Sequence, residues 1–369
     1  MKYGVHVSDL RTYLSCRRKW DWSSLLRQGL EKKVTYAPFF TGRGIHYCMQ
    51  QYYETGLHPT AFLPSFVKQE TEAMSEAGDL WEQEMDMIES QVELMDAMLD
   101  HYVVWAEGNT RGLWVDDNLR FISFETEFNV PLRAPSGRAS SRIDLEGRFD
   151  GIVQRVDNGT YWLWEVKTAR SIDQLVSTLD NDLQAGVYCL AAQELLGEPV
   201  MGVLYNIMRK KAPTYPRVLN NGMLSKASNI DTTPHYYLKA IKEHHADIFV
   251  PGNKPESVLI TEMYGDILKT LMEKSREKPF FQRVAIRRTQ TELENIAQQI
   301  HYVGLEMVRP STKIYPNPAW NTCTFCSFKA PCLTMNAGAD YEVILDAEYR
   351  PRRIWDPLEA TEAGNGNIG

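Results

Sequence analysis

The feature that most constrains the fold is strand-like periodicity that begins near residue 121. Apolar and polar residues alternate over three segments, residues 121–130, 142–156 and 161–168. The residues Asp157-Asn158-Gly159-Thr160 separate the last two segments and predict a hairpin turn. A helix over residues 181–196, ended by Gly197, and a strand over residues 200–208 are expected next. This order of elements predicts an α/β fold with a mixed sheet.

The hairpin brings polar side chains onto one face of the sheet. If Asn158-Gly159 is a two-residue loop, Asp150 lies opposite Lys167. Opposed and alternate residues share a face, so Asp150, Glu165 and Lys167 converge. The other face then carries a predicted core of Phe149, Val153, Trp162, Trp164 and Val166.

Clustered carboxylates in an otherwise apolar sheet suit a hard divalent ion such as Mg²⁺ or Mn²⁺. Such an ion lowers the pKa of bound water and stabilises charge on a phosphate, with Lys167 placed to assist. An exposed hairpin with an ion pair between Asp150 and Lys167 explains the same residues equally well. These residues alone leave both interpretations open.

Three cysteines in a short segment are a stronger signal, with the spacing Cys323-x2-Cys326-x5-Cys332. A zinc or iron-sulfur site needs a fourth ligand. Cys16 is favoured because the basic residues 17–19 stabilise a thiolate. A single Cys-x2-Cys pair with one distant cysteine fits the usual zinc spacings poorly. The two remaining cysteines are expected to be buried free thiols within helices: Cys48 and Cys189.

Residues 69–100 contain eleven acids and no Lys or Arg, and without these acids the formal charge of −8 becomes +3. The remaining chain therefore permits a cationic groove. Apolar residues recur in this segment at spacings of four and three: Trp81, Met85, Ile88, Val92, Met95, Leu99 and Tyr102. This seam predicts one long helix that packs on the core as an insertion, in preference to a dimerising coiled coil.

The rest of the chain is less regular. Ser8 is a candidate N-cap of a short helix that ends near Cys16, and a second helix with His46 ends near Gly56. Residues 209–279 give no confident structure, apart from a basic segment at their start. A strand over residues 280–286 and a helix over residues 289–303 are expected.

Residues 202–217 contain four cations and no acid, with two tyrosines between them. Cations beside aromatic side chains suit the phosphates and bases of single-stranded DNA. A solvated basic loop is an equally good interpretation. The residues concerned are Tyr205, Arg209, Lys210, Lys211, Tyr215 and Arg217.

These motifs together resemble the RecB/AddB-like branch of the PD-(D/E)XK nucleases that carries a 4Fe-4S cluster, a branch that includes the CRISPR-associated exonucleases. The resemblance runs in order along nearly the whole chain, with insertions at the acidic segment and after residue 208. The matching motifs are Ser8-x-Leu10-x-x-Tyr13-x-x-Cys16, Gly44-Ile45-His46, Gly147-Arg148-Phe149-Asp150-Gly151, Glu165-Val166-Lys167, Gln184-x3-Tyr188, and the cysteines Cys323, Cys326 and Cys332.

The resemblance implies a metal-dependent DNA exonuclease acting on single-stranded DNA or DNA ends in recombination, repair or replication. It implies that His46, Asp150, Glu165 and the Val166 carbonyl hold Mg²⁺ or Mn²⁺, while Lys167 assists attack on the phosphodiester. Gln184 and Tyr188 are expected to contact DNA or order the site. A structural 4Fe-4S cluster is expected on four cysteines: Cys16, Cys323, Cys326 and Cys332.

Six segments are predicted: N-terminal helices at 1–56, an acidic helical insertion at 57–118, the nuclease core at 119–208, an elaboration of unclear role at 209–288, a C-terminal helix and cysteine cluster at 289–350, and a flexible tail at 351–369. No stretch approaches the ~20 apolar residues of a membrane span, and the chain begins without an apolar signal segment, so a cytoplasmic protein is expected. No P-loop motif is present, so any unwinding needs a separate helicase or recombination protein. A non-catalytic DNA-binding subunit and a zinc-stabilised interaction protein remain as alternatives.

Overall fold

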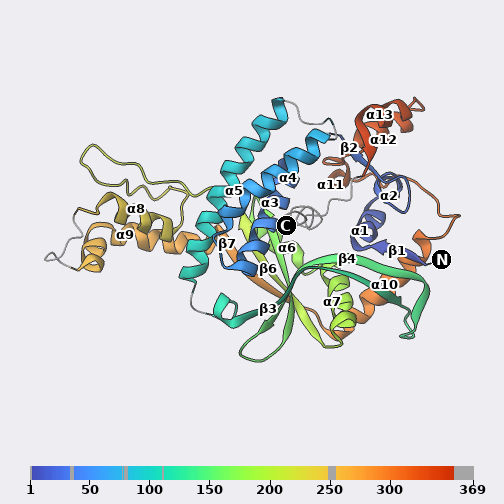
Figure 1. Cartoon of the computed structure of the whole chain (residues 1–369), viewed down its shortest axis with the longest axis horizontal. Helices are drawn as coiled ribbons and strands as arrows, with labels where there is room; N and C mark the ends of the chain where they lie inside the picture. The colour runs from blue at the N-terminus through green and yellow to red at the C-terminus, as the bar shows by residue number, and fades with distance from the viewer. Residues whose placement is uncertain are drawn as a thin grey trace, which may run out of the picture.

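A computed structural model describes residues 2–33, 37–76, 78, 82–109, 112–247 and 255–352 (Figure 1). Within these ranges the core is a six-stranded sheet in the order β1-β4-β5-β6-β7, with β3 also paired to β4. Its strands are β1 (Tyr3–His6), β3 (Leu119–Arg133), β4 (Ala139–Arg155), β5 (Tyr161–Ala169), β6 (Val200–Arg209) and β7 (Phe281–Arg287). β1 and β4 are parallel, as are β5 and β6, whereas the other pairs are antiparallel. The predicted α/β fold with a mixed sheet is confirmed.

Strand β4 shares one of its edges between two partners. Its first half pairs with β1 as far as Glu146, and its second half pairs with β5 from Gly151 onward. β3 runs along the opposite edge. Among the described residues, 147–150 therefore have no strand partner on the shared edge. This gap between β1 and β5 lies directly at Asp150.

Three helices cover one face of the sheet (Figure 1): α1 (Val7–Ser15), α7 (Leu183–Leu196) and α10 (Gln290–Met307). Leu10, Val187 and Ile300 from these helices are buried in one cluster with the sheet residues Leu163 and Ile207. The Asp182 carboxylate caps α7, and a Thr289–Glu292 capping box begins α10. The helices predicted over 181–196 and 289–303 are thereby confirmed.

The acidic insertion packs on the core, as the sequence predicted, and it covers the other face of the sheet. It consists of α4 (Leu63–Glu76) and α5 (Glu82–Gly108), which pack beside α3 (Ala37–Thr55) over Trp162 and Trp164. The long helix predicted for the apolar seam is confirmed, because its members from Met85 to Tyr102 all lie on α5. The first acids of the segment belong to α4, which ends at Glu76, and Gly78 has the left-handed φ of 70°. Trp81, the predicted start of the seam, lies outside the described residues. The members of the seam buried against the core are Ile88, Met95, Leu99 and Tyr102.

Two smaller units extend from this core (Figure 1). Helices α8 (Pro234–His244) and α9 (Glu256–Glu277), for which the sequence analysis gave no structure, share a separate apolar cluster. The C-terminal unit contains α11 (Trp320–Cys323), α12 (Lys329–Asn336) and α13 (Glu342–Glu348), and it packs on Trp22 of α2 (Arg17–Ser23). Residues 353–369, most of the predicted tail, lie outside the described residues. The remaining short elements are β2 (Leu30–Lys32), β8 (Tyr349–Pro351), α6 (Ile172–Leu179), η1 (Pro59–Phe62) and η2 (Asp116–Asn118).

The N-terminal helix ends near Cys16, as expected, but its N-cap and the place of the basic residues 17–19, expected near its end, were predicted wrongly. The helix begins at Val7, with His6 rather than Ser8 at the N-cap, because the β1 strand runs through His6 and leads directly into the first turn. Cys16 has an extended backbone between α1 and α2. The basic residues 17–19 therefore begin the second helix instead of ending the first.

The predicted hairpin register was wrong by two residues. The loop comprises residues 156–159, closed by an Arg155 N–H that donates to the Thr160 carbonyl, and Gly151 consequently pairs with Trp164. A shift of two residues preserves the alternation, so the side chains other than Phe149 stay on their predicted faces. Phe149 packs with Leu163 instead of Val153, at the point where β4 leaves β5.

Candidate active site

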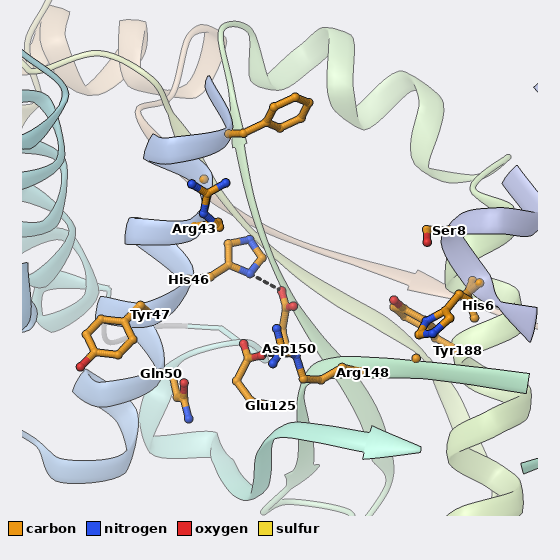
Figure 2. A pocket seen from close by; sticks show the side chains of 14 residues that line it. His6, Ser8, Arg43, His46, Tyr47, Gln50, Glu125, Arg148, Asp150 and Tyr188 are labelled. Carbon is orange, nitrogen blue, oxygen red and sulfur yellow. Dashed lines mark ion pairs between the residues drawn. The ribbon is translucent and has the colours of Figure 1, made fainter. Parts of the chain in front are cut away.

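The site is built around Asp150 in the gap between β1 and β5. The Asp150 carboxylate accepts a hydrogen bond from the Val166 backbone N–H, with Oδ2 at 2.8 Å from the nitrogen. A side chain thus joins β4 to β5 just beyond their last backbone pair. His46 Nδ1 lies 3.2 Å from the same oxygen (Figure 2). The Gly-x-His and Glu-x-Lys segments therefore meet at one aspartate.

Close helix packing places His46 in the cleft. A Cβ at Gly44 would lie 2.4 Å from Met95 Sδ and 2.8 Å from the Phe66 ring. Glycine at this position therefore lets α3 approach both helices of the acidic insertion. His46 is two residues further along α3 and faces the open edge of the sheet.

Glu125 is a candidate site residue that sequence reasoning missed. One ligand atom each from His46, Glu125 and Asp150 lie within 4.8 Å of one another, a group that could hold a metal ion. Glu125 is on β3 between residues paired to Gly151 and Phe149, so it faces Asp150, and its φ of 39° is unusual for a non-glycine residue. The register of β3 on β4, which the sequence analysis did not derive, is the signal that finds it.

Glu165 and Lys167 lie on the other side of Asp150. The Lys167 ammonium donates to Glu165 Oε1, and the Glu165 side chain is buried. Burial lowers the pKa of Lys167, but the charges of Glu165 and Asp150 outweigh burial and raise it overall. Lys167 is therefore a cation at neutral pH.

The carboxylates differ in their ionisation. Burial, followed by the charge of Asp150, raises the pKa of Glu125 to about 7. Burial also acts to raise the pKa of Asp150, but His46, Lys167 and the Val166 N–H outweigh it and lower this pKa overall. Burial and the charge of Asp150 raise the pKa of Glu165. Asp150 is thus the ionised centre of the site, and Glu125 is the group that titrates near neutral pH.

A cavity of about 490 Å³ opens onto this group. In Figure 2, Arg43 and His46 project into it from α3, while His6, Ser8 and Tyr188 lie on the opposite side. Gln184 is one turn before Tyr188 on α7 and accepts a hydrogen bond from Arg11 of α1 at 2.7 Å. The structure therefore brings Tyr188 to the cavity and places Gln184 beside it.

The four cysteines selected from the sequence lie where α2 meets the C-terminal unit. Arg18 donates to Cys332 Sγ at 3.4 Å, and the Asn317 N–H donates to Cys16 Sγ at 3.4 Å. Burial raises the pKa of Cys326, and the charges of Cys16 and Cys323 add to this effect. No three described cysteines have all their sulfur atoms within 4.8 Å of one another. Cys48 and Cys189 are buried free thiols, as predicted.

Side chains of the basic segment make more contacts within the protein than the sequence implied. Tyr205 is buried in the core and donates to Asp182, so it is not available to stack on a base. Arg209 and Lys211 both pair with Asp231. Tyr215 packs edge-on against Tyr236, and Arg217 is exposed. Burial lowers the pKa of Lys210.

A mixed sheet covered by helices on both faces, with a His/Glu/Asp group beside a Glu-x-Lys segment, defines a nuclease with a restriction-endonuclease-like core. The chain belongs to the PD-(D/E)XK nuclease superfamily, whose family model matches residues 5–333. No curated protein matches the chain significantly. Among the described helices, none is long and apolar enough to cross a membrane.

Proposed function

We propose that this protein is a metal-dependent DNA exonuclease that hydrolyses phosphodiester bonds in single-stranded DNA or at DNA ends, in recombination, repair or replication. The observation that carries the proposal is the meeting of His46, Glu125 and Asp150 beside Glu165 and Lys167. Superfamily membership supports nuclease chemistry at this site.

The donor set fits a divalent metal ion. Two carboxylates and one imidazole present ligand atoms within 4.8 Å of one another. Oxygen ligands suit Mg²⁺ and Mn²⁺. Glu165 and the Val166 carbonyl are further proposed ligands. They lie near the group, because the Val166 N–H donates to Asp150. A bound divalent ion supplies a water of lowered pKa and stabilises negative charge on the phosphate.

The protein's own groups then have distinct roles. Asp150 and Glu165 contribute negative charge to hold the cation. Lys167 keeps its positive charge and offsets the negative charge that develops on the phosphate. Tyr188 lies at the cavity with a hydroxyl whose pKa is raised by burial, so it is a neutral hydrogen-bond donor to a phosphate oxygen. Gln184 orders Tyr188 from the adjacent turn.

The exonuclease assignment is tested with end-labelled DNA in Mg²⁺ or Mn²⁺. We expect the wild type to release nucleotides from linear single strands and to leave a circular single strand of the same sequence intact, because a circle has no end. Cutting of the circle at the same rate would show that the protein is an endonuclease and not an exonuclease. Binding without cleavage under either metal would identify a non-catalytic DNA-binding subunit.

We also propose that Cys16, Cys323, Cys326 and Cys332 hold a 4Fe-4S cluster with a structural role. The N-terminal helices and the C-terminal unit already share a small core formed by Trp22, Phe328, Leu345 and Tyr349. A cluster there fastens together segments some 300 residues apart, a loop whose closure is entropically costly. The nearby cations Arg18 and Lys19 favour thiolates.

Anaerobic purification separates this cluster from zinc. We expect a brown protein with absorbance near 400 nm and bound iron and sulfide. Cys332→Ser should lose the colour, whereas Cys189→Ser, which changes a buried core thiol, should retain it. A colourless protein with stoichiometric zinc would overturn the iron-sulfur assignment.

The residues Arg209, Lys210, Lys211, Tyr215 and Arg217 remain a proposed second DNA contact. Because Asp231 offsets two of these cations, the exposed Arg217 and Tyr215 are the members best placed to meet a strand. Arg217→Ala should weaken binding of single-stranded DNA uniformly across sequences. Unchanged affinity would remove this segment from the DNA surface.

A further inference from the structure

Arg43 brings a cation to the cavity, and the acidic insertion fixes its position. Arg43 lies three residues before His46 on α3, so both side chains leave the same face of the helix (Figure 2). Arg43 Nε donates to Glu70 Oε1 at 2.8 Å, and Nη2 donates to Oε2 at 2.6 Å. This two-point contact fixes the plane of the guanidinium.

The burial of this pair is unequal. The Glu70 side chain is 5% exposed, whereas that of Arg43 is 33% exposed. Glu70 is the one buried acid among the described acids of residues 69–100, the rest of which are partly or fully exposed. The pair therefore has its negative end in the core and its positive end at the cavity.

A DNA strand needs such a group at this point. The carboxylates of Glu125 and Asp150 line the cavity, and a phosphate adjacent to the scissile one would face them. A guanidinium matches the geometry of a phosphate, and the Arg43 side chain is partly exposed at the cavity.

We propose that Arg43 binds a backbone phosphate next to the one that is cleaved, and that Glu70 is the positioning residue that orients Arg43. This inference rests on the proposed nuclease function and gives the acidic insertion a role in substrate binding. It predicts that one phosphate contact depends on the Arg43–Glu70 pair.

The test measures binding of a fluorescein-labelled single-stranded oligonucleotide by anisotropy at several KCl concentrations, with Ca²⁺ replacing the catalytic metal. Each phosphate contact on a single strand contributes about 0.7 to the slope of log K against log salt. We expect the double variant Arg43→Gln/Glu70→Gln, which leaves no unpaired buried charge, to bind more weakly with a slope shallower by about 0.7. Glu70→Gln alone should raise KM for cleavage while kcat and Mn²⁺ affinity stay unchanged.

A second Arg–Glu pair provides the matched control. Arg133 and Glu194 also form a two-point contact, but neither residue lines the cavity. Arg133→Gln/Glu194→Gln should keep the wild-type affinity and slope. An equal loss of slope in both double variants would show that the effect is not specific to the cavity and would overturn the proposal.

Two further outcomes are decisive. If the Arg43→Gln/Glu70→Gln variant binds like the wild type while the wild type cuts DNA, the inference fails and the nuclease function stands. If the wild type neither binds nor cuts DNA, the proposed function fails first. If the double variant does not fold, Arg43→Lys provides the test, because lysine keeps the charge but lacks the paired donors of the guanidinium. Weaker binding at an unchanged slope supports the proposal, and wild-type affinity contradicts it.

Discussion

Glu125 is a residue whose protonation couples stability to pH. Its pKa is raised from 4.5 to about 7, so between these values the metal-free folded state holds a proton that the unfolded chain has lost. The free energy of unfolding therefore falls as the pH rises through this range. Glu125→Gln removes this contribution, so its stability advantage over the wild type should grow from pH 5 to pH 8 in urea unfolding with a chelator. Parallel pH profiles would contradict the assigned pKa.

The same proton should leave when a metal ion binds. Because a carboxylate ligand must be deprotonated, Mn²⁺ binding at pH 6.5 should release a large fraction of one proton from the wild type. Calorimetry in two buffers of different ionisation enthalpy measures this number. Glu125→Gln should bind Mn²⁺ more weakly and release less of a proton. Equal proton release by both proteins would exclude Glu125 as a ligand.

At the residue scale, the sequence led to His46, Asp150, Glu165 and Lys167 through short motifs whose spacing is local. Asp150 and the Glu-x-Lys segment shared a predicted face even though the register was wrong, since an error of two residues preserves the alternation. Glu125 was not predicted, because nothing in the local sequence distinguishes it from other acids on β3. Its role depends on pairing with a strand that returns after an irregular turn.

At the element scale, helix α5 anchors the acidic insertion on the sheet. Leu99→Ala should destabilise the protein by about 2–5 kcal/mol, because Leu99 is fully buried and its loss leaves a cavity. Met85→Ala on the same helix is the control: Met85 is 48% exposed, and its replacement should change stability by less than about 0.5 kcal/mol. Urea unfolding measures both. Equal costs would mean that the predicted seam does not face the core.

The strongly periodic elements of the main core were predicted from the sequence, whereas helices α8 and α9 were not. The strands of residues 121–168 and helix α7 follow clear apolar patterns and end at turn residues. Helix α9 also carries spacings of four and three in Ile260, Tyr264, Ile267 and Leu271, so its sequence does contain a helical signal. The break between α4 and α5 was not predicted, because the acidic residues run on through both helices while the chain turns near Gly78.

At the scale of the whole molecule, contacts between the two ends of the chain hold the C-terminal unit in place. Phe328 is buried against Trp22 and stacks on Tyr349, whereas Phe325 is 85% exposed. Phe328→Ala should cost about 3–5 kcal/mol locally and accelerate hydrogen exchange over residues 317–349. Phe325→Ala should leave exchange unchanged. Equal exchange in both variants would show that this small core does not hold the unit.

The gap that forms the candidate active site is also a property of the whole molecule. It exists because β1 stops at Glu146 of β4 and β5 begins at Gly151, and β1 comes from a segment more than 130 residues earlier in the chain. No local pattern reports this pairing. The sequence could therefore name residues of the site but could not describe the opening that exposes them.

The most direct test of the account compares two aspartates on one strand. Asp150 lies in the gap, whereas Asp144, six residues earlier on β4, pairs with Lys2 beside β1. With linear single-stranded DNA and Mn²⁺, Asp150→Asn should lower the cleavage rate at least about 100-fold, and Asp144→Asn should cleave like the wild type. Cleavage by Asp150→Asn at the wild-type rate, with both variants folded, would contradict the assignment of the gap as the catalytic centre.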